Sequence, residues 1–168
     1  MNLNSDRVLL LAEAETHAVV CDARIAAIRW DLVPWSLVLD LDIPISEQQD
    51  ARMRRAWVVF FGISMCSLSL SNARLPTGIW ITSKMWVETL FDRGFRKASF
   101  RVLLIEGNSS EAAENNASKE VAIVCRKIVG VTSVDSCVGG ELGLTWKDRT
   151  GLASDAELRN LLVNYEDE

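Results

Sequence analysis

The chain has 168 residues, of which 49% are hydrophobic and 24% are charged, and these values argue against an intrinsically disordered protein. Eighteen Lys and Arg oppose twenty-three Asp and Glu, which gives a net charge of −5 at pH 7. This negative charge repels nucleic-acid phosphates and anionic lipid. We therefore expect a single folded domain over residues 1–168 that binds no nucleic acid.

The cysteines and the N-terminus bear on the cellular compartment. Cys21, Cys66, Cys125 and Cys137 include no Cys-x-x-Cys pair, which argues against a zinc site or a thioredoxin-like motif. The N-terminus lacks the basic start and apolar core of a secretory signal peptide. The longest apolar runs, such as residues 57–63, are too short to span a membrane. We expect free thiols and a cytoplasmic protein with no membrane partner.

Two elements and a turn are predicted before residue 35. Ser5 can cap a short helix that carries Val8, Leu9, Leu11 and Ala12, with Glu13 and Glu15 on its outer side, although Val8 to Leu11 fits a first strand equally well. Residues 23–30 carry apolar side chains on nearly both sides, the pattern of a strand that is covered on both faces. Residues 31–34 end in proline and predict a turn, so this strand and the next should form a hairpin.

The clearest strand covers residues 35–45. Apolar residues occupy every second position from Leu37 to Ile43, and Asp40 and Asp42 fall between them. This period of two predicts a strand with one buried face and one solvated face. A strand of a parallel sheet is covered on both faces, so two carboxylates on one of them favour an antiparallel sheet.

Further short strands follow along the chain. Residues 46–55 are interpreted as a polar connection in which Arg52, Arg54 and Arg55 lie on a solvated loop. Gly62 is expected to form a β-bulge within the next strand. The predicted strands are then residues 57–70, 79–82, 85–90, 95–105, 120–131 and 142–146, with a mobile loop at 107–119.

The C-terminus contains the strongest helix signal. Ser154-Asp-Ala-Glu157 matches a capping box, and Leu158, Leu161, Leu162 and Tyr165 form one apolar stripe behind it. Many strands with helical signals only at the ends predict an α+β fold that is mainly β. We expect an antiparallel sheet that forms a sandwich or half-barrel, with a C-terminal helix packed against it.

Signals for catalysis or cofactor binding are weak. The single histidine, His17, has no neighbouring nucleophile motif, and no pattern indicates a cofactor or a metal site. Asp31, Asp40 and Asp42 are the remaining candidates. They could line the cavity of a half-barrel enzyme or small-ligand binder, hold a hard cation, present an acidic patch to a cationic partner, or simply be solvated.

Residues 17–42 resemble the opening hairpins of small β-rich immunity proteins from bacterial toxin–immunity systems. The resemblance lies in Asp22-Ala-Arg-Ile25, Ile28-Arg-Trp-Asp31 and Leu37-Val-Leu-Asp-Leu-Asp42. It implies a protein that neutralises a cognate toxin by direct binding. It also implies an acidic protein, because many such toxins are basic nucleases.

The first hypothesis is therefore a non-enzymatic protein-binding module, an immunity protein whose partner is a basic toxin. Exposed aromatic side chains beside carboxylates are good anchors for a protein partner. The predicted interface comprises Trp35, Asp40, Asp42, Glu47 and Asp50. The alternatives are the half-barrel enzyme or ligand binder described above, and a structural subunit of a larger assembly.

Overall fold

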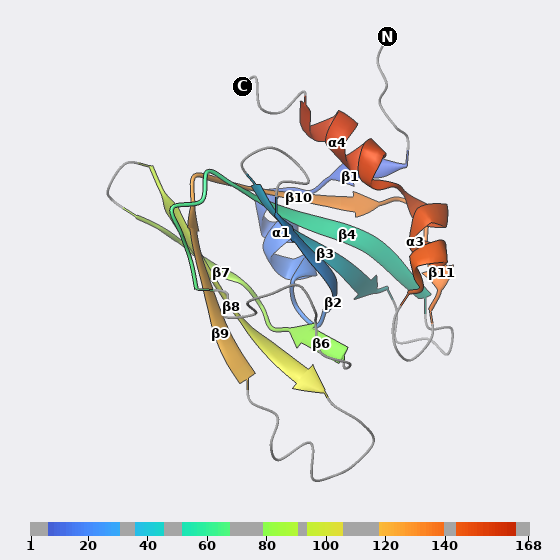
Figure 1. Ribbon diagram of the computed structural model, residues 1–168, viewed down its shortest axis with the longest axis horizontal. Coiled ribbons are helices and arrows are strands. Elements are labelled where there is room, and N and C mark those ends of the chain that lie inside the picture. The colour runs from blue at the N-terminus through green and yellow to red at the C-terminus, as the bar shows by residue number, and fades with distance from the viewer. Residues whose placement is uncertain are drawn as a thin grey trace.

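In a computed structural model of the protein, the described residues are 7–30, 36–45, 52–67, 79–90, 94–105, 118–139 and 144–163. They form strands and a few short helices (Figure 1). In chain order these elements are β1 (Val8–Leu10), α1 (Glu13–Val19), β2 (Arg24–Trp30), β3 (Ser36–Pro44), β4 (Arg52–Phe61), β5 (Met65–Cys66), β6 (Ile79–Thr82), β7 (Trp86–Thr89), β8 (Arg96–Ile105), β9 (Ser118–Cys125), β10 (Lys127–Ser133), β11 (Cys137–Val138), α3 (Trp146–Leu152) and α4 (Asp155–Val163).

The described strands form one antiparallel sheet of 11 strands. Their order is β1-β10-β4-β3-β2-β6-β8-β9-β5, with β11 also paired to β4 and β7 also paired to β8. Figure 1 shows two halves set at an angle, one containing β2, β3, β4 and β10 and the other containing β7, β8 and β9. The predicted α+β fold, mainly β and antiparallel with a C-terminal helix, is confirmed.

The main core fills the space between the two halves. Leu37, Leu39 and Leu41 of β3 are fully buried there, together with Phe100 of β8 and Ile123 of β9. Burial of each such side chain contributes roughly 1.5–3 kcal/mol to folding. The period-two pattern of β3 therefore identified its inward face correctly.

A second core lies on the outer face of β3, β4 and β10. Val38, Trp57 and Val59 pack there against Leu158 and Leu162 of α4. The predicted capping box at the start of this helix is confirmed. The backbone N–H of Ser154 donates to the Glu157 carboxylate at 2.7 Å, and the backbone N–H of Glu157 donates to the Ser154 hydroxyl at 3.4 Å.

Several predicted boundaries differ from the structure. Of the two alternatives for residues 8–11, the strand is correct, because residues 8–10 pair with β10, and the first helix begins only at Glu13. Residues 120–131 form two strands, because the chain turns at Arg126 and carries β10 to the opposite half of the sheet. Gly62 adopts a positive φ of 63° just after β4 ends, where it lets the chain turn away rather than forming a bulge.

The end of the predicted strand 142–146 is also wrong. Trp146 begins α3, and Thr145 caps it: its hydroxyl accepts from the backbone N–H of Asp148 at 3.2 Å, while the Asp148 carboxylate accepts from the backbone N–H of Thr145 at 3.0 Å. Thr-x-x-Asp is a variant of the capping box, and it overrides the local strand pattern. Residues 52–55, predicted to be a solvated loop, are the first part of β4.

Candidate functional site

Asp40 and Asp42, the two carboxylates of β3, are buried. Their exposed fractions are 2% and 1%. They point to the outer face of the sheet, as the alternation predicts, but the segment 144–163 covers that face. The prediction of a solvated acidic face is therefore wrong, because alternation shows which residues share a face and not what packs over it.

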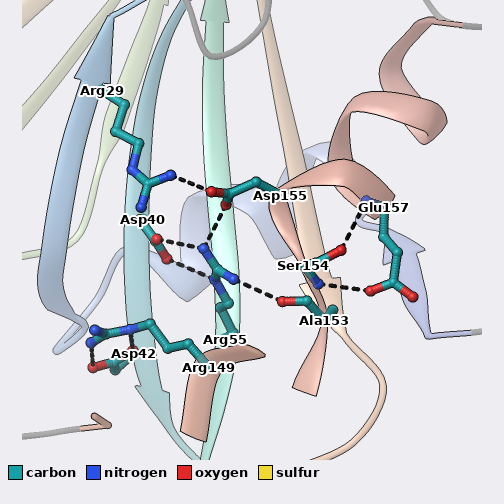
Figure 2. A network of polar contacts seen from close by, with 9 residues as sticks. All are labelled: Arg29, Asp40, Asp42, Arg55, Arg149, Ala153, Ser154, Asp155 and Glu157. Carbon is teal, nitrogen blue, oxygen red and sulfur yellow. Dashed lines mark hydrogen bonds and ion pairs between the residues drawn. The ribbon is translucent and has the colours of Figure 1, made fainter. Parts of the chain in front are cut away.

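Asp40 forms a two-point ion pair with Arg55 of the neighbouring strand β4 (Figure 2). The Nε and Nη2 atoms of Arg55 donate to the two carboxylate oxygens of Asp40 at 3.2 and 2.8 Å. The Arg55 guanidinium also lies over the Trp57 ring, 4.6 Å from its centroid. A planar guanidinium matches a carboxylate in this way, and lysine could not replace it here.

The same guanidinium connects the sheet to the C-terminal segment. Nη1 of Arg55 donates to the carbonyl oxygen of Ala153 at 2.7 Å, and Nη2 donates to Asp155 at 2.7 Å. Asp155, the first residue of α4, also pairs with Arg29 of β2. Arg55 was predicted to lie on a solvated loop, but it is only 3% exposed. It connects β4, on which it lies, with β3 and with the C-terminal segment.

Asp42 makes a second connection of the same kind. It accepts hydrogen bonds from the Nε and Nη2 atoms of Arg149 in α3, the former at 3.1 Å. The backbone N–H of Leu144 donates to the same carboxylate at 3.1 Å. Arg7, near the N-terminus, adds an ion pair to Glu157 at 3.5 Å. Ion pairs and hydrogen bonds therefore connect residues 144–163 to the rest of the protein at several points.

Burial changes the acidity of this cluster. It raises the pKa of Asp40 above the usual 3.8, because the loss of hydration outweighs the hydrogen bonds and the attraction from Arg55. Burial lowers the pKa of Arg55, but its interactions with Asp40 and Asp155 outweigh this and leave the value raised. Arg55 thus stays charged while the ionisation of Asp40 is opposed.

The oxygens of these carboxylates are occupied by guanidinium and amide donors. A general base needs a carboxylate within reach of a substrate proton, and a hard cation needs free oxygen ligands. Neither Asp40 nor Asp42 offers this arrangement. Among the described residues, no three His, Cys, Asp or Glu side chains come together so that they could hold a metal ion.

The other predicted site residues lie outside the described residues. These are Trp35, Glu47 and Asp50 of the interface hypothesis and Asp31 of the cavity hypothesis. His17, in α1, is half-buried. Within the described ranges, no helix is both long and apolar enough to cross a membrane.

Negative charge is unevenly distributed along the sequence. The described ranges contain 16 Lys and Arg against 11 Asp and Glu, whereas the remaining segments contain 2 Lys and Arg against 12 Asp and Glu. The net charge of −5 therefore originates in the connecting segments and the two ends of the chain. The regular elements by themselves carry a positive excess.

Sequence reasoning missed the basic partners of the cluster, Arg29, Arg55 and Arg149. A signal existed for Arg29, a lone charge in the apolar run 25–30, and for Arg55, which directly precedes the apolar run 56–61. A charge beside an apolar strand run suggests a buried partner. Arg149 carries no comparable signal, since its helix was not predicted.

Comparisons with protein-family models, with curated proteins and with solved structures find no match for this chain.

Proposed function

We propose that this chain is a non-enzymatic protein-binding module, an immunity protein that neutralises a basic bacterial toxin by direct binding. The observation that carries the proposal is that Asp40 and Asp42 are buried and paired with arginines. The alternative, an enzyme or small-ligand binder, depended on these carboxylates lining a cavity with Asp31. Both are instead engaged by arginines beneath the C-terminal helices.

The distribution of charge supports the same proposal, and the burial of Asp40 and Asp42 changes which residues we expect at the interface. Since Asp40 and Asp42 are buried, they do not contact a partner that approaches this surface. Twelve of the 23 acidic residues lie in segments between and beyond the described ranges, among them Glu47 and Asp50. We propose that Trp35, Glu47 and Asp50 contact the toxin, and that Asp40 and Asp42 act indirectly by holding the fold.

Negative charge on connecting segments suits a basic partner. Charged groups at the edge of an interface steer the encounter and raise the association rate, and salt weakens their effect. An aromatic anchor such as Trp35 supplies the apolar contact that charge alone lacks. We therefore expect fast binding that slows as the ionic strength rises.

The first experiment is affinity capture of the tagged chain from lysate of its own host at low ionic strength. We expect a basic protein that is released at moderate ionic strength. Expressed alone, that protein should inhibit bacterial growth, and co-expression of this chain should restore growth. Capture of no protein by folded bait, or of one that is harmless when expressed, would contradict the proposal.

A matched pair of variants then tests the interface. Glu47→Gln/Asp50→Asn should weaken binding of the captured toxin about tenfold, mainly through the association rate. The control, Glu15→Gln/Asp135→Asn, removes the same amount of charge from two exposed positions elsewhere. It should leave affinity within about threefold of the parent, since it changes the net charge and not the interface. Equal losses in both variants would show that only net charge matters.

A further inference from the structure

The C-terminal segment, residues 144–163, can leave the sheet without breaking any pairing between the described strands. It follows β11, the last described strand in the chain, and its described elements are the helices α3 and α4. Figure 1 shows these two helices in red, one after the other along one side of the sheet. Proteins open locally in contiguous units, and a terminal unit outside the strand pairing is suited to open by itself.

The apolar contact between this segment and the sheet is small. The buried hydrophobic side chains that the segment contributes are Leu144, Leu152, Ala153, Leu158 and Leu162. Among the described residues, the main core contains 15 buried hydrophobic residues, and none of them comes from this segment. The main core therefore stays intact when the segment leaves.

Ion pairs supply much of the remaining attachment. Four of them join the segment to the rest of the protein: Arg7–Glu157, Arg29–Asp155, Arg55–Asp155 and Arg149–Asp42. Asp155 takes part in two of these pairs and is 27% exposed, while Arg7 and Arg29 are 42% and 40% exposed. Salt screens ion pairs that water reaches, so the attachment weakens as the ionic strength rises.

The charges beneath the segment keep partners within the sheet. Asp40 and Arg55 form their two-point ion pair between β3 and β4 themselves. Asp42 is directly opposite Arg24 of β2 and directly opposite Arg55 of β4 in the strand register. Departure of the segment therefore returns these groups to water and leaves each carboxylate beside an opposite charge.

Trp57 supplies a contribution that favours opening. Its side chain is fully buried in the second core beneath α4, and among the described residues no group accepts a hydrogen bond from its indole Nε1. A buried donor without an acceptor loses its bond to water and gains none in return. Departure of the segment lets water accept from this N–H.

We propose that the C-terminal segment is a strap that opens as one unit while the sheet stays folded, and that ionic strength sets the balance between the closed and open states. At low ionic strength the ion pairs hold α3 and α4 on the sheet. At higher ionic strength these pairs weaken, and the apolar side chains of Val38, Trp57 and Val59 become accessible. The strap thus controls access to an apolar surface that the closed protein conceals.

Hydrogen exchange of the folded protein, followed by NMR at constant pH in about 0.02 M and about 0.5 M NaCl, tests this proposal. The amides of α4 and the indole N–H of Trp57 should be protected about tenfold less than the amides of β3 and β4. The higher salt concentration should lower the protection of α4 and of the Trp57 indole by the same factor, about fivefold. The protection of β3 and β4 should change by less than about twofold.

A matched pair of variants tests the part of the ion pairs. Asp155→Asn removes the carboxylate that Arg29 and Arg55 share. It should lower the protection of α4 about tenfold in low salt, leave that of β3 and β4 within about twofold, and remove most of the salt effect. The control, Glu88→Gln, removes the same charge from an exposed position of β7 and should change none of these values.

The parent chain alone can overturn the proposal. Equal protection of α4 and of β3 and β4, with the same dependence on urea, would show that the segment opens only when the whole protein unfolds. A protection of α4 that does not respond to salt would also overturn it. These measurements need no substitution and no partner, so they are decisive whether or not Asp155→Asn folds and whether or not a toxin is captured.

Discussion

Arg149 in α3 donates its Nε to Asp42 in β3 at 3.1 Å, which joins positions 107 residues apart in the sequence. The backbone N–H of Leu144 donates to the same carboxylate, so one side chain of the sheet holds both the loop before α3 and the helix itself. Arg55 makes a connection of the opposite polarity, because here a basic side chain of the sheet donates to the Ala153 carbonyl oxygen and to the Asp155 carboxylate. The C-terminal segment is thus attached by polar contacts as well as by the packing of α4.

Removal of the Asp42 charge should destabilise the protein. Asp42→Asn keeps the size of the side chain but leaves the Arg149 guanidinium without its counter-ion. We expect a loss of roughly 2 kcal/mol in the free energy of unfolding, measured in urea, because a partly buried charge loses its partner. Glu15→Gln, at an exposed position of α1, is the control and should change stability by less than about 0.5 kcal/mol. A similarly small effect of Asp42→Asn would contradict this account.

A double-mutant cycle should show strong coupling between Asp40 and Arg55. Arg55→Met leaves the buried Asp40 without its ion-pair partner, and we expect it to cost about 3–5 kcal/mol. Asp40→Leu leaves Arg55 paired with Asp155 and should cost less, about 1–3 kcal/mol, for the hydrogen bonds that are lost. The combined variant should cost clearly less than the sum, since no unpaired charge remains between these positions and hydration of Asp40 no longer opposes folding. Arg54→Met, one residue away and exposed, is the matched control. Additive losses would rule out the proposed coupling.

The raised pKa of Asp40 predicts the sign of a pH effect. A carboxyl group whose pKa is higher in the folded state binds its proton more readily when folded, so its protonation stabilises the fold. This contribution is complete below about pH 3.8 and is lost as the pH rises through the raised pKa. The parent should therefore lose stability relative to Asp40→Asn as the pH rises from about 3 to about 7. A parent that instead gains stability relative to this variant would mean that Arg55 lowers the pKa of Asp40.

The cysteines should differ sharply in reactivity. Burial raises the pKa of the Cys125 thiol to about 11, whereas Cys21 is exposed. The thiolate is the reactive form, so iodoacetamide at mildly alkaline pH should modify Cys21 rapidly and Cys125 only after unfolding. Mass spectrometry of peptides from native and urea-unfolded protein measures both rates. Equal modification of the two thiols in the native protein would show that the β8–β9 core opens readily.

The sequence predicted the elements whose signals are local. The alternation of residues 37–43 identified β3 and its inward leucines, and the Ser154–Glu157 box identified the start of α4. These signals depend on the backbone period and on hydrogen bonds between residues three apart, so they can be read from a short stretch. The hairpin of β2 and β3 was also predicted correctly, since a short connection favours pairing of consecutive strands.

The candidate site depended on contacts between distant segments. Asp40 and Asp42 look the same in sequence whether water or a helix covers them, and Arg55 looks like a loop residue until β4 pairs with β3. Likewise, the run 120–131 reads as one strand, and only the turn at Arg126 assigns its two parts to opposite halves of the sheet. The sequence by itself determined the class of the fold and the inward face of β3, because periodicity is a property of the backbone. Only the tertiary structure decided that the two carboxylates are buried, because Arg55, which pairs with Asp40, comes from the neighbouring strand β4, and Arg149, which pairs with Asp42, comes from a helix 107 residues away.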